Sequence, residues 1–348
     1  MMRLVKWAKT WGASAIIGRF GVEEEALLFR DAGLVVLAQD YKERMVHIPN
    51  ITGDYLRTGD MAARFFIEKG FRSFAFCGYR DAVWSRERCE GFRSAVERAR
   101  MGDNFYLYDN QSVDDLRNYE SRPLLKWLQS LPPQTALFAC DDNQGNRITE
   151  ICKVNKIRVP EHLAILGVDN DEMICNLSDP SLSSILHDVE EGGYMAAERI
   201  DHILRGEQGR CSEDGDVVIQ PQGILSRLST ESFSTTDPYV RKALKYIHQN
   251  YAGRISVTDV VRQVPLSRRM LEMRFKVATQ ESVYRYILNL RMEMLAQQLV
   301  SGDDPISEVA SRVGISSLKN LSRQFKHVKG LTPQEYRARY GKRSKSTT

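Results

Sequence analysis

The chain has 348 residues, with 49 Lys and Arg, 45 Asp and Glu and a hydrophobic fraction of 42%. A chain of this length is long for one hydrophobic core, so two or three domains are expected. No stretch approaches the roughly 18 uninterrupted apolar residues of a membrane span, and the start lacks an apolar signal segment, which excludes a membrane protein and predicts a cytoplasmic location.

Cysteine and histidine usage excludes several kinds of chemistry. The six cysteines lie between Cys77 and Cys211 without a Cys-x-x-Cys pair or regular spacing, which is typical of free, reduced thiols. The six histidines are scattered. Because no Ser/His/Asp or Cys/His set, metal-ligand spacing or phosphate-binding glycine loop is visible, we expect no catalytic residue, no metal and no cofactor.

Charge is distributed unevenly along the chain. Residues 237–348 hold 21 Lys and Arg against 9 Asp and Glu, whereas the preceding residues hold 28 against 36. A basic segment joined to an acidic one is typical of a nucleic-acid-binding module fused to a domain that does not contact phosphate.

The first 225 residues alternate short β-rich runs with amphipathic helical patterns, which is typical of a parallel α/β sheet. The predicted strands are Ser14–Ile17, Leu34–Leu37, Ser73–Cys77, Ala136–Ala139 and Leu163–Gly167. The predicted helices are Glu23–Asp31, Gly59–Lys69, Arg86–Arg98, Asn143–Val154 and Gly192–Leu204. We expect Gly70 to end the second of these helices as a C-cap. Pro160 is expected to bar the fourth helix from continuing into the next strand.

Five phrases in this region resemble, in order, the core of LacI-type repressors and periplasmic sugar-binding proteins. They are residues 66–78 (FIEKGFRSFAFCG), 88–92 (RCEGF), 139–142 (ACDD), 165–170 (ILGVDN) and 180–185 (PSLSSI). The resemblance implies a two-lobed α/β core that binds a small sugar. Such cores open with a strand, a helix and a second strand, and this chain starts in the helix that follows. Two explanations stay open, a start assigned too late or an N-terminally truncated core, and we expect the chain as written to bind sugar poorly.

Four residues of this core are predicted to bind the ligand. Asp142 and Asp169 follow predicted strands, and ligands of open α/β sheets bind beyond the carboxyl ends of strands. Trp84 and Arg88 lie at the start of a helical pattern. A sugar requires an apolar surface for its ring and charged groups for its hydroxyls, which this set provides. Surface ion pairs with a packed tryptophan remain an open alternative.

A polar stretch separates the core from the basic segment. Residues 226–236 are rich in Ser and Thr, and Asp237-Pro238 follows, a dipeptide typical of turns. We interpret residues 226–238 as a linker between a core at 1–225 and a domain at 239–340. Residues 341–348 form a basic tail.

One short pattern occurs twice in the basic segment. Residues 257–267 (VTDVVRQVPLS) are echoed by residues 306–316 (ISEVASRVGIS), and each copy runs into a helical pattern with Leu and Phe four residues apart. Each copy therefore predicts two helices joined by a tight turn, a helix-turn-helix. A helical pattern from Glu281 to Val300 lies between the copies. It has an apolar stripe on which both copies can pack.

The doubled pattern, together with residues 314–317 (GISS), 321–326 (LSRQFK) and 330–337 (GLTPQEYR), resembles the AraC/XylS family of transcription regulators. The resemblance implies an all-α domain with two helix-turn-helix units. Such units place two recognition helices in successive major-groove segments of a double-stranded DNA operator, about 34 Å apart.

The same resemblance assigns the DNA-binding residues. The predicted set is Arg268, Arg269, Glu272, Met273, Arg274, Leu318, Lys319, Arg323 and Lys326. Arginine is the commonest reader of guanine, and a glutamate accepts from cytosine. For Arg268 and Arg274, contact with phosphate alone is an equally open alternative. Pro265 and Met273 stand where the second copy has Gly314 and Arg323, so we expect the second unit to read more sequence than the first.

The fused arrangement resembles regulators of pentose operons. It implies a homodimeric transcription regulator whose core binds a pentose, xylose in particular. Two rivals stay open. One is a sugar-processing enzyme with an attached DNA-binding domain, and the other is a DNA-binding regulator whose core only dimerises or senses a different sugar.

Overall fold

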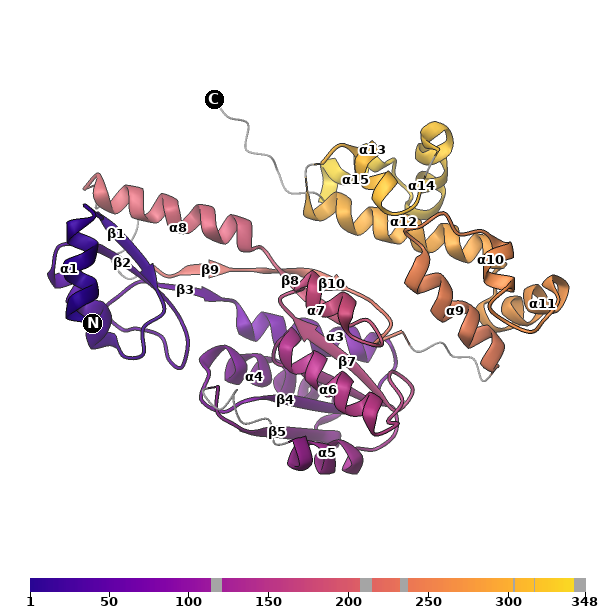
Figure 1. Ribbon diagram of the computed structural model, residues 1–348, viewed down its shortest axis with the longest axis horizontal. Helices are drawn as coiled ribbons and strands as arrows, with labels where there is room; N and C mark the ends of the chain where they lie inside the picture. Colours follow the sequence, from indigo (N-terminus) through magenta and orange to yellow (C-terminus); the bar gives the residue numbers. More distant parts are fainter. Residues whose placement is uncertain (114–120, 207–214, 232–236, 303, 316, 341–348) are drawn as a thin grey trace. The chain divides into compact units, whose positions relative to one another are not determined.

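The computed structural model describes residues 1–113, 121–206, 215–231, 237–302, 304–315 and 317–340 (Figure 1). It divides into two compact units, Met1–Glu231 and Ser232–Thr348. The first unit continues past the predicted end of the core. Ser229 and Thr230, predicted as linker, are fully buried, and Ser229 Oγ donates to the Ile165 carbonyl oxygen (2.6 Å). Linker residues 232–236 and the tail 341–348 lie outside the described residues.

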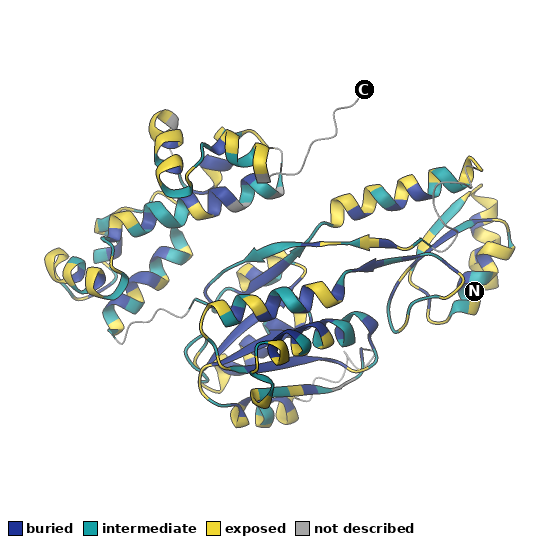
Figure 2. Ribbon diagram, turned by 180° about the vertical axis from the view of Figure 1, so that it is seen from behind, coloured by how far each residue is buried: buried dark blue, intermediate teal, exposed yellow. Residues whose placement is uncertain are grey.

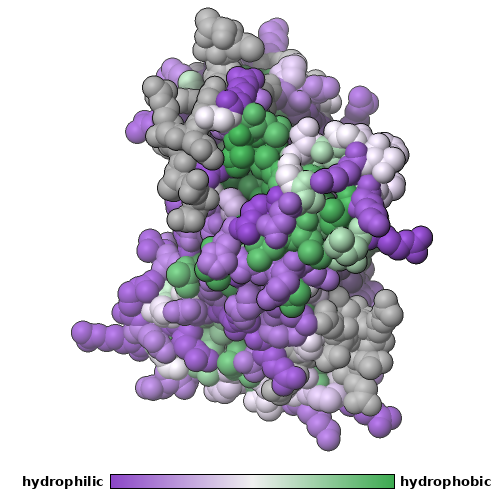
Figure 3. Space-filling model, turned by 90° about the vertical axis from the view of Figure 1, so that its left-hand side faces the viewer, coloured by the Kyte–Doolittle hydropathy of each residue, from purple (hydrophilic) through white to green (hydrophobic). Residues whose placement is uncertain are grey.

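The N-terminal lobe of the first unit is built on one parallel sheet. Its strands, in the order β1-β2-β3-β9, are Ala15–Gly18, Val35–Gln39, Asn50–Gly53 and Val217–Ile219. Its helices are α1 (Met2–Thr10), α2 (Glu23–Asp31) and α8 (Val189–Leu204). In the described part of the chain β1 lies at the edge of the sheet and pairs with β2. Leu4 and Trp7 of α1 and the following Trp11 are exposed, and hydrophobic surface is visible at this end of the first unit (Figure 3).

The second lobe is built on a larger sheet with the order β10-β8-β7-β6-β4-β5, in which β10 is antiparallel to β8. In chain order its elements are α3 (Tyr55–Glu68), β4 (Ser73–Tyr79), α4 (Val83–Arg98), a 3-10 turn η1 (Gly102–Asn104), β5 (Phe105–Gln111), α5 (Ser121–Ser130), β6 (Thr135–Ala139), α6 (Asp142–Val154), β7 (Leu163–Val168), α7 (Glu172–Leu177), β8 (Ser183–His187) and β10 (Pro221–Leu225). Buried residues concentrate in its central strands (Figure 2). Gly70 has φ +87° just after α3, which confirms the predicted C-cap.

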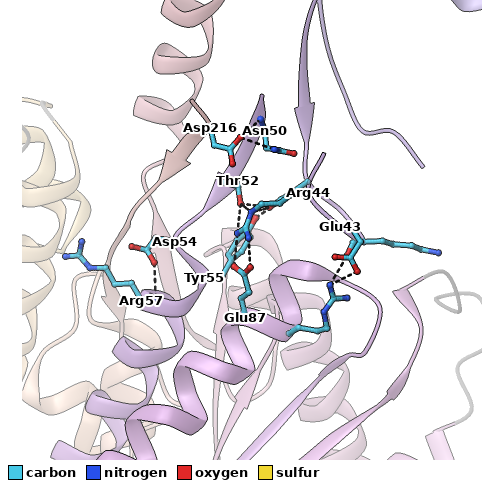
Figure 4. Close-up of polar contacts among 12 residues, drawn as sticks. Glu43, Arg44, Asn50, Thr52, Asp54, Tyr55, Arg57, Glu87 and Asp216 are labelled. Atoms are coloured by element: carbon cyan, nitrogen blue, oxygen red, sulfur yellow. Dashed lines mark hydrogen bonds and ion pairs between the residues drawn. The ribbon is translucent and has the colours of Figure 1, made fainter. Parts of the chain in front are cut away.

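Three segments cross between the lobes, at residues 53–55, 187–189 and 219–221. They are tied together by backbone hydrogen bonds, from Asp54 N to Ile219 O (2.9 Å) and from Asp188 N to Gln220 O (3.1 Å). The same two aspartates cap helices, because Asp54 accepts from Arg57 N at the start of α3 (Figure 4) and Asp188 accepts from Glu191 N at the start of α8. The crossing segments therefore form one compact hinge that connects the two lobes.

The second unit is helical. Its elements are α9 (Pro238–Asn250), α10 (Val257–Val261), α11 (Arg268–Thr279), α12 (Val283–Ser301), α13 (Ile306–Arg312), a 3-10 turn η3 (Leu318–Asn320), α14 (Leu321–Lys329) and α15 (Pro333–Tyr340). The paired helices α10/α11 and α13/α14 confirm the predicted helix-turn-helix units, and α12 confirms the long helix between them. Leu271 and Phe275 of the first helix-turn-helix and Leu321 and Phe325 of the second are buried.

The cysteines of the described residues confirm the expected free thiols. Cys77, Cys89, Cys140, Cys152 and Cys175 form no disulfide. Cys211 lies outside the described residues. Burial raises the pKa of the Cys77 thiol to about 12, so this thiol stays protonated and behaves as a small apolar side chain.

Candidate DNA interface and ligand site

The first recognition helix, α11, starts at a conventional cap. Ser267 accepts a hydrogen bond from Met270 N (3.3 Å), and the preceding helix α10 starts with a capping box between Ser256 and Asp259. The cap leaves Arg268 and Arg269 exposed in the first turn. Met273 is exposed one turn later, at 55% of its surface.

Two other predicted DNA-binding residues of α11 are engaged within the protein. The Glu272 carboxylate accepts from Val283 N (3.2 Å) and so holds the first turn of α12. Arg274 Nη1 donates to Asp237 Oδ2 (3.2 Å), at the start of α9, and its guanidinium lies 5.7 Å from the centre of the Tyr239 ring. Both side chains therefore support the fold around the first helix-turn-helix, and any contact with DNA competes with these bonds.

The second recognition helix presents its predicted residues to solvent. Lys319, Arg323 and Lys326 are exposed, and Arg323 Nη2 donates to Asn320 Oδ1 (3.3 Å) one turn earlier. Leu318 belongs to η3, but its side chain lies outside the part of the chain that the structure describes. The outward face of α14 therefore carries positive charge that is free to meet phosphate or base edges.

The long helix α12 and the second helix-turn-helix meet the backbone that follows α9. From α12, Arg291 Nε donates to the Tyr251 carbonyl oxygen (2.8 Å) and Nη2 donates to the Gly253 carbonyl oxygen (2.7 Å). Gly314, in the turn of the second unit, has φ +82°, and an added Cβ would lie 2.5 Å from the same Tyr251 oxygen. Only glycine fits this turn, because both its backbone conformation and its surroundings exclude a side chain.

The candidate ligand site lies where α4 meets α3. Two glycines allow these helices to approach closely, because a Cβ on Gly59 would lie 2.2 Å from Arg88 O and one on Gly91 would lie 2.0 Å from Leu56 O. The approach brings Arg88 of α4 against Tyr55 of α3. The structure therefore uses helix packing to build the site.

Arg88 is buried, with 4% of its surface exposed, and its guanidinium lies between two aromatic rings. It is 5.1 Å from the centre of the Tyr55 ring and 5.3 Å from that of Trp84. Nη1 donates to Cys140 O (2.5 Å) and Nη2 to Asp169 Oδ1 (3.3 Å). Within the described residues, Arg88 Nε has no hydrogen-bond partner.

Asp169 follows β7 with φ +99°, and about half of its side chain (53%) is exposed. Its Oδ1 also lies 3.6 Å from His187 Nδ1. Burial alone would raise the pKa of Asp169, but the Arg88 guanidinium and His187 outweigh burial and lower it, so the carboxylate is charged near neutral pH. Three of the four residues predicted to bind the ligand, Trp84, Arg88 and Asp169, thus lie next to one another.

Asp142 occupies a different environment. It is almost fully buried, its Oδ1 accepts from Ser184 Oγ (2.6 Å) and its Oδ2 accepts from Asp171 N (2.8 Å). Burial raises the pKa of Asp142 to about 7, which the hydrogen bonds only partly offset. These contacts join the start of α6 to the loop after β7 and to the start of β8, so Asp142 acts as a support beside the site.

Sequence reasoning missed the neighbouring Asp141. It caps α6 by accepting from Gln144 N (2.7 Å), and burial together with the Asp169 carboxylate raises its pKa to about 6, against the lowering effect of the helix cap and Arg88. The available signal was its position directly after a predicted strand, which it shares with Asp142. Tyr55 carried no comparable signal, because its contact with Arg88 depends on how two helices pack.

A polar network bridges the two lobes beside this site (Figure 4). Arg44, in the loop after β2, donates from Nη2 to Glu87 Oε2 of α4 (2.7 Å) and to Thr52 Oγ1 of β3 (3.1 Å). Tyr55 OH donates to Asp40 Oδ1 (2.9 Å) at the end of β2. The N-terminal lobe therefore holds both Tyr55 and the helix that carries Arg88.

Comparisons with known proteins match both units of the chain to known domains. Residues 63–230 match a periplasmic binding protein-like domain, and residues 260–339 match a helix-turn-helix domain. The solved complex of the transcriptional regulator CelR with cellobiose has the same core fold, with a TM-score of 0.54 and 22% identity over 66% of this chain and 69% of that chain. The chain is a DNA-binding transcription regulator with a periplasmic-binding-protein-like core.

Longer matches define the family. The xylose operon regulatory proteins of Haemophilus influenzae and Escherichia coli K12 are 33% and 30% identical to this chain, over 84% and 94% of it and 75% and 85% of their own lengths. The solved xylose-binding transcription activator XylR is 28% identical, with a TM-score of 0.59 over 94% of this chain and 87% of that chain. The chain belongs to the family of xylose operon regulatory proteins.

Two features are absent from the described part of the chain. Among its residues, no helix has the length and apolar character needed to cross a bilayer. The same residues hold no cluster of three or more His, Cys, Asp or Glu side chains placed to bind a metal ion. The relatives named above are regulatory proteins of the xylose operon.

Proposed function

We propose that the chain is a sugar-responsive transcription regulator whose helical unit binds a DNA operator and whose α/β core binds a pentose, xylose. The buried guanidinium of Arg88 carries the sugar part of this proposal, since its Nε has no partner among the described residues. A buried donor without an acceptor costs about 1–3 kcal/mol. A ligand hydroxyl beside Arg88 would recover that energy.

The surrounding groups suit a polyhydroxylated ligand. Arg88 donates and Asp169 accepts, so two neighbouring hydroxyls satisfy both at once. Trp84 and Tyr55 supply apolar surface for the carbons of the sugar ring. Asp141, with a pKa of about 6, can accept or donate at the same site, and Asp142 supports the loop that holds Asp169.

In this proposal the sugar changes how the two lobes sit together. The Arg44–Glu87 pair already joins the lobes next to the site, so a ligand that contacts both lobes favours the same arrangement. We place the protein in the cytoplasm, without enzymatic activity, as a homodimer formed through the core. Sugar binding then shifts the relative placement of two DNA-binding domains, residues 239–340 of each copy.

The family of the relatives motivates xylose as the ligand, and calorimetric titration of the full chain with D-xylose tests it. We expect weak but saturable binding, lost in Arg88→Met and retained in Arg98→Met, which removes an exposed arginine from the same helix. Asp169→Asn, which preserves the side-chain shape, should also weaken binding.

The titration separates the proposal from its rivals. Binding of other sugars but not xylose would identify a different effector. A dimer that binds no sugar would indicate that the core serves only to dimerise the protein. Loss of xylose from the mixture, followed by NMR, would reveal an enzyme.

A further inference from the structure

The two recognition helices have matching geometry and opposite chemistry at their centres. Each residue of an α-helix advances by about 100° around the axis, so two buried residues four apart define the inward direction. In α11 these are Leu271 and Phe275, and the residue that lies about 180° from their midpoint is Met273. In α14 the buried pair is Leu321 and Phe325, and the opposite residue is Arg323.

The flanks of the two helices also correspond. Lys276 of α11 and Lys326 of α14 occupy the same flank, and both are exposed. On the other flank α11 has Val277, 74% exposed, where α14 has His327. Helix α11 therefore has the same basic flank as α14, but apolar side chains stand where α14 has polar ones at its centre.

This apolar stretch is not part of a core. Met270 (37% exposed), Met273 (55%) and Val277 (74%) lie on the solvent side of α11. Exposed apolar side chains that cluster mark a binding surface. Arg268 and Arg269 in the first turn and Lys276 beside Met273 surround the cluster with positive charge. A surface with cations around an apolar centre complements the major groove of DNA, where phosphates line both edges.

Base chemistry selects what Met273 contacts at the floor of the groove. Guanine, adenine and cytosine present only hydrogen-bonding groups there, whereas thymine adds a 5-methyl group. Met offers no N–H or O–H donor and only a weak acceptor, so it would leave the groups of the other bases unpaired. A thioether and a methyl group bury apolar surface together, worth about 0.8 kcal/mol for one carbon.

We propose that Met273 reads a thymine through its 5-methyl group, so the half-site under the first helix-turn-helix has an A·T pair at that position. The half-site under the second unit has a G·C pair read by Arg323. This inference rests on the proposed DNA-binding function and specifies which bases the two units recognise.

Thymine-to-uracil substitution tests it, because it removes the 5-methyl group and keeps base pairing. An operator is first selected from random duplexes with the full chain. Each thymidine is then replaced in turn by deoxyuridine, and the Kd is measured by fluorescence anisotropy. We expect one position in the first half-site to weaken binding roughly fourfold.

Protein variants assign the effect to its residue. In Met273→Ala that position should become insensitive to uracil, whereas Arg323→Ala should keep the sensitivity and lose preference for guanine in the other half-site. Met173→Ala removes a more exposed methionine (69%) from α7 of the core and should bind every duplex as the wild type does. Circular dichroism confirms that each variant is folded.

The possible failures are distinct. If a specific operator is recovered but no thymine in it is sensitive to uracil, Met273 does not read a methyl group and the inference is wrong. The same holds if Met273→Ala retains the full sensitivity. If no sequence is enriched, both this inference and the proposed operator recognition fail.

Discussion

Gly314→Ala should destabilise the helical unit through one crowded contact. Gly314 has φ +82°, a conformation that alanine adopts at a cost of about 1 kcal/mol or more. The new Cβ would lie 2.5 Å from Tyr251 O, 2.9 Å from Ala252 O and 3.0 Å from Arg291 Nε. Since two of these neighbours are backbone atoms, the turn itself has to move.

The size of the effect follows from the bonds that share this space. Arg291 donates to the carbonyl oxygens of Tyr251 (2.8 Å) and Gly253 (2.7 Å), and a hydrogen bond from a charged group contributes about 1.5–3 kcal/mol. Losing one of them along with the conformational cost destabilises the unit by about 3 kcal/mol. At a urea dependence near 1.5 kcal/mol per molar, the midpoint falls by about 2 M.

Two probes separate the units during urea unfolding of the full chain. All four tryptophans lie in the α/β unit Met1–Glu231, so their fluorescence does not report directly on the helical unit. They are Trp7, Trp11, Trp84 and Trp127. Far-ultraviolet circular dichroism reports on both units. We expect Gly314→Ala to shift the dichroism transition of the helical unit and to leave the fluorescence transition unchanged.

Gly330→Ala is the matched control. Gly330 has φ +77°, but an added Cβ would meet no atom within 4 Å, so only the conformational cost applies, about 1 kcal/mol. The reasoning fails if Gly314→Ala is no more destabilising than Gly330→Ala, or if the tryptophan transition moves as far as the dichroism transition.

Three further changes have defined outcomes. Arg323→Ala should weaken operator binding by about 1–3 kcal/mol and relax preference at one base pair, and an equal loss on random DNA would refute base reading. Lys326→Ala should weaken all sequences alike and lower the salt dependence of binding by about one phosphate contact, as measured by titrations at several salt concentrations. Folded Asp142 has a pKa of about 7 against 3.8 ordinarily, so it holds its proton more tightly than in the unfolded chain. Its stabilising contribution to the free energy of unfolding is complete below about pH 4 and is lost as the pH rises to 7, a change of about 2–4 kcal/mol. Urea unfolding of Asp142→Asn at several pH values should lack this part of the pH dependence.

The fold was predictable where a hydrophobic period was strong. The helix Glu23–Asp31 was predicted with the bounds it has, and the predicted start of the strand at Ser73 is also that of β4. The prediction did not identify β5 or β8. Tyr106, Asp109 and Asn110 give β5 little apolar alternation, and Ser183 and Ser184 make β8 look like a turn although both are buried in the core.

The candidate sites were predictable where chain position alone determines location. Asp169 could be placed because it comes directly after a predicted strand. Arg323 could be placed on a recognition helix because of its position in the repeated pattern. Contacts between distant residues were not predictable. The position of Arg88 against Tyr55 requires Gly59 to meet the backbone of α4. Glu272, which looks exposed in the sequence, holds the start of α12 because its helix ends beside that turn.

The outward faces of α11 and α14 have a consequence for how such regulators diverge. Met273 and Arg323 are exposed and are absent from the buried residues that hold each unit together. Substitutions at such surface positions usually change folding free energy by less than about 0.5 kcal/mol. With Met273 and Arg323 in the base-reading roles proposed above, a lineage can exchange the side chains that select its operator one half-site at a time. The sugar-sensing core need not change while the set of controlled genes does.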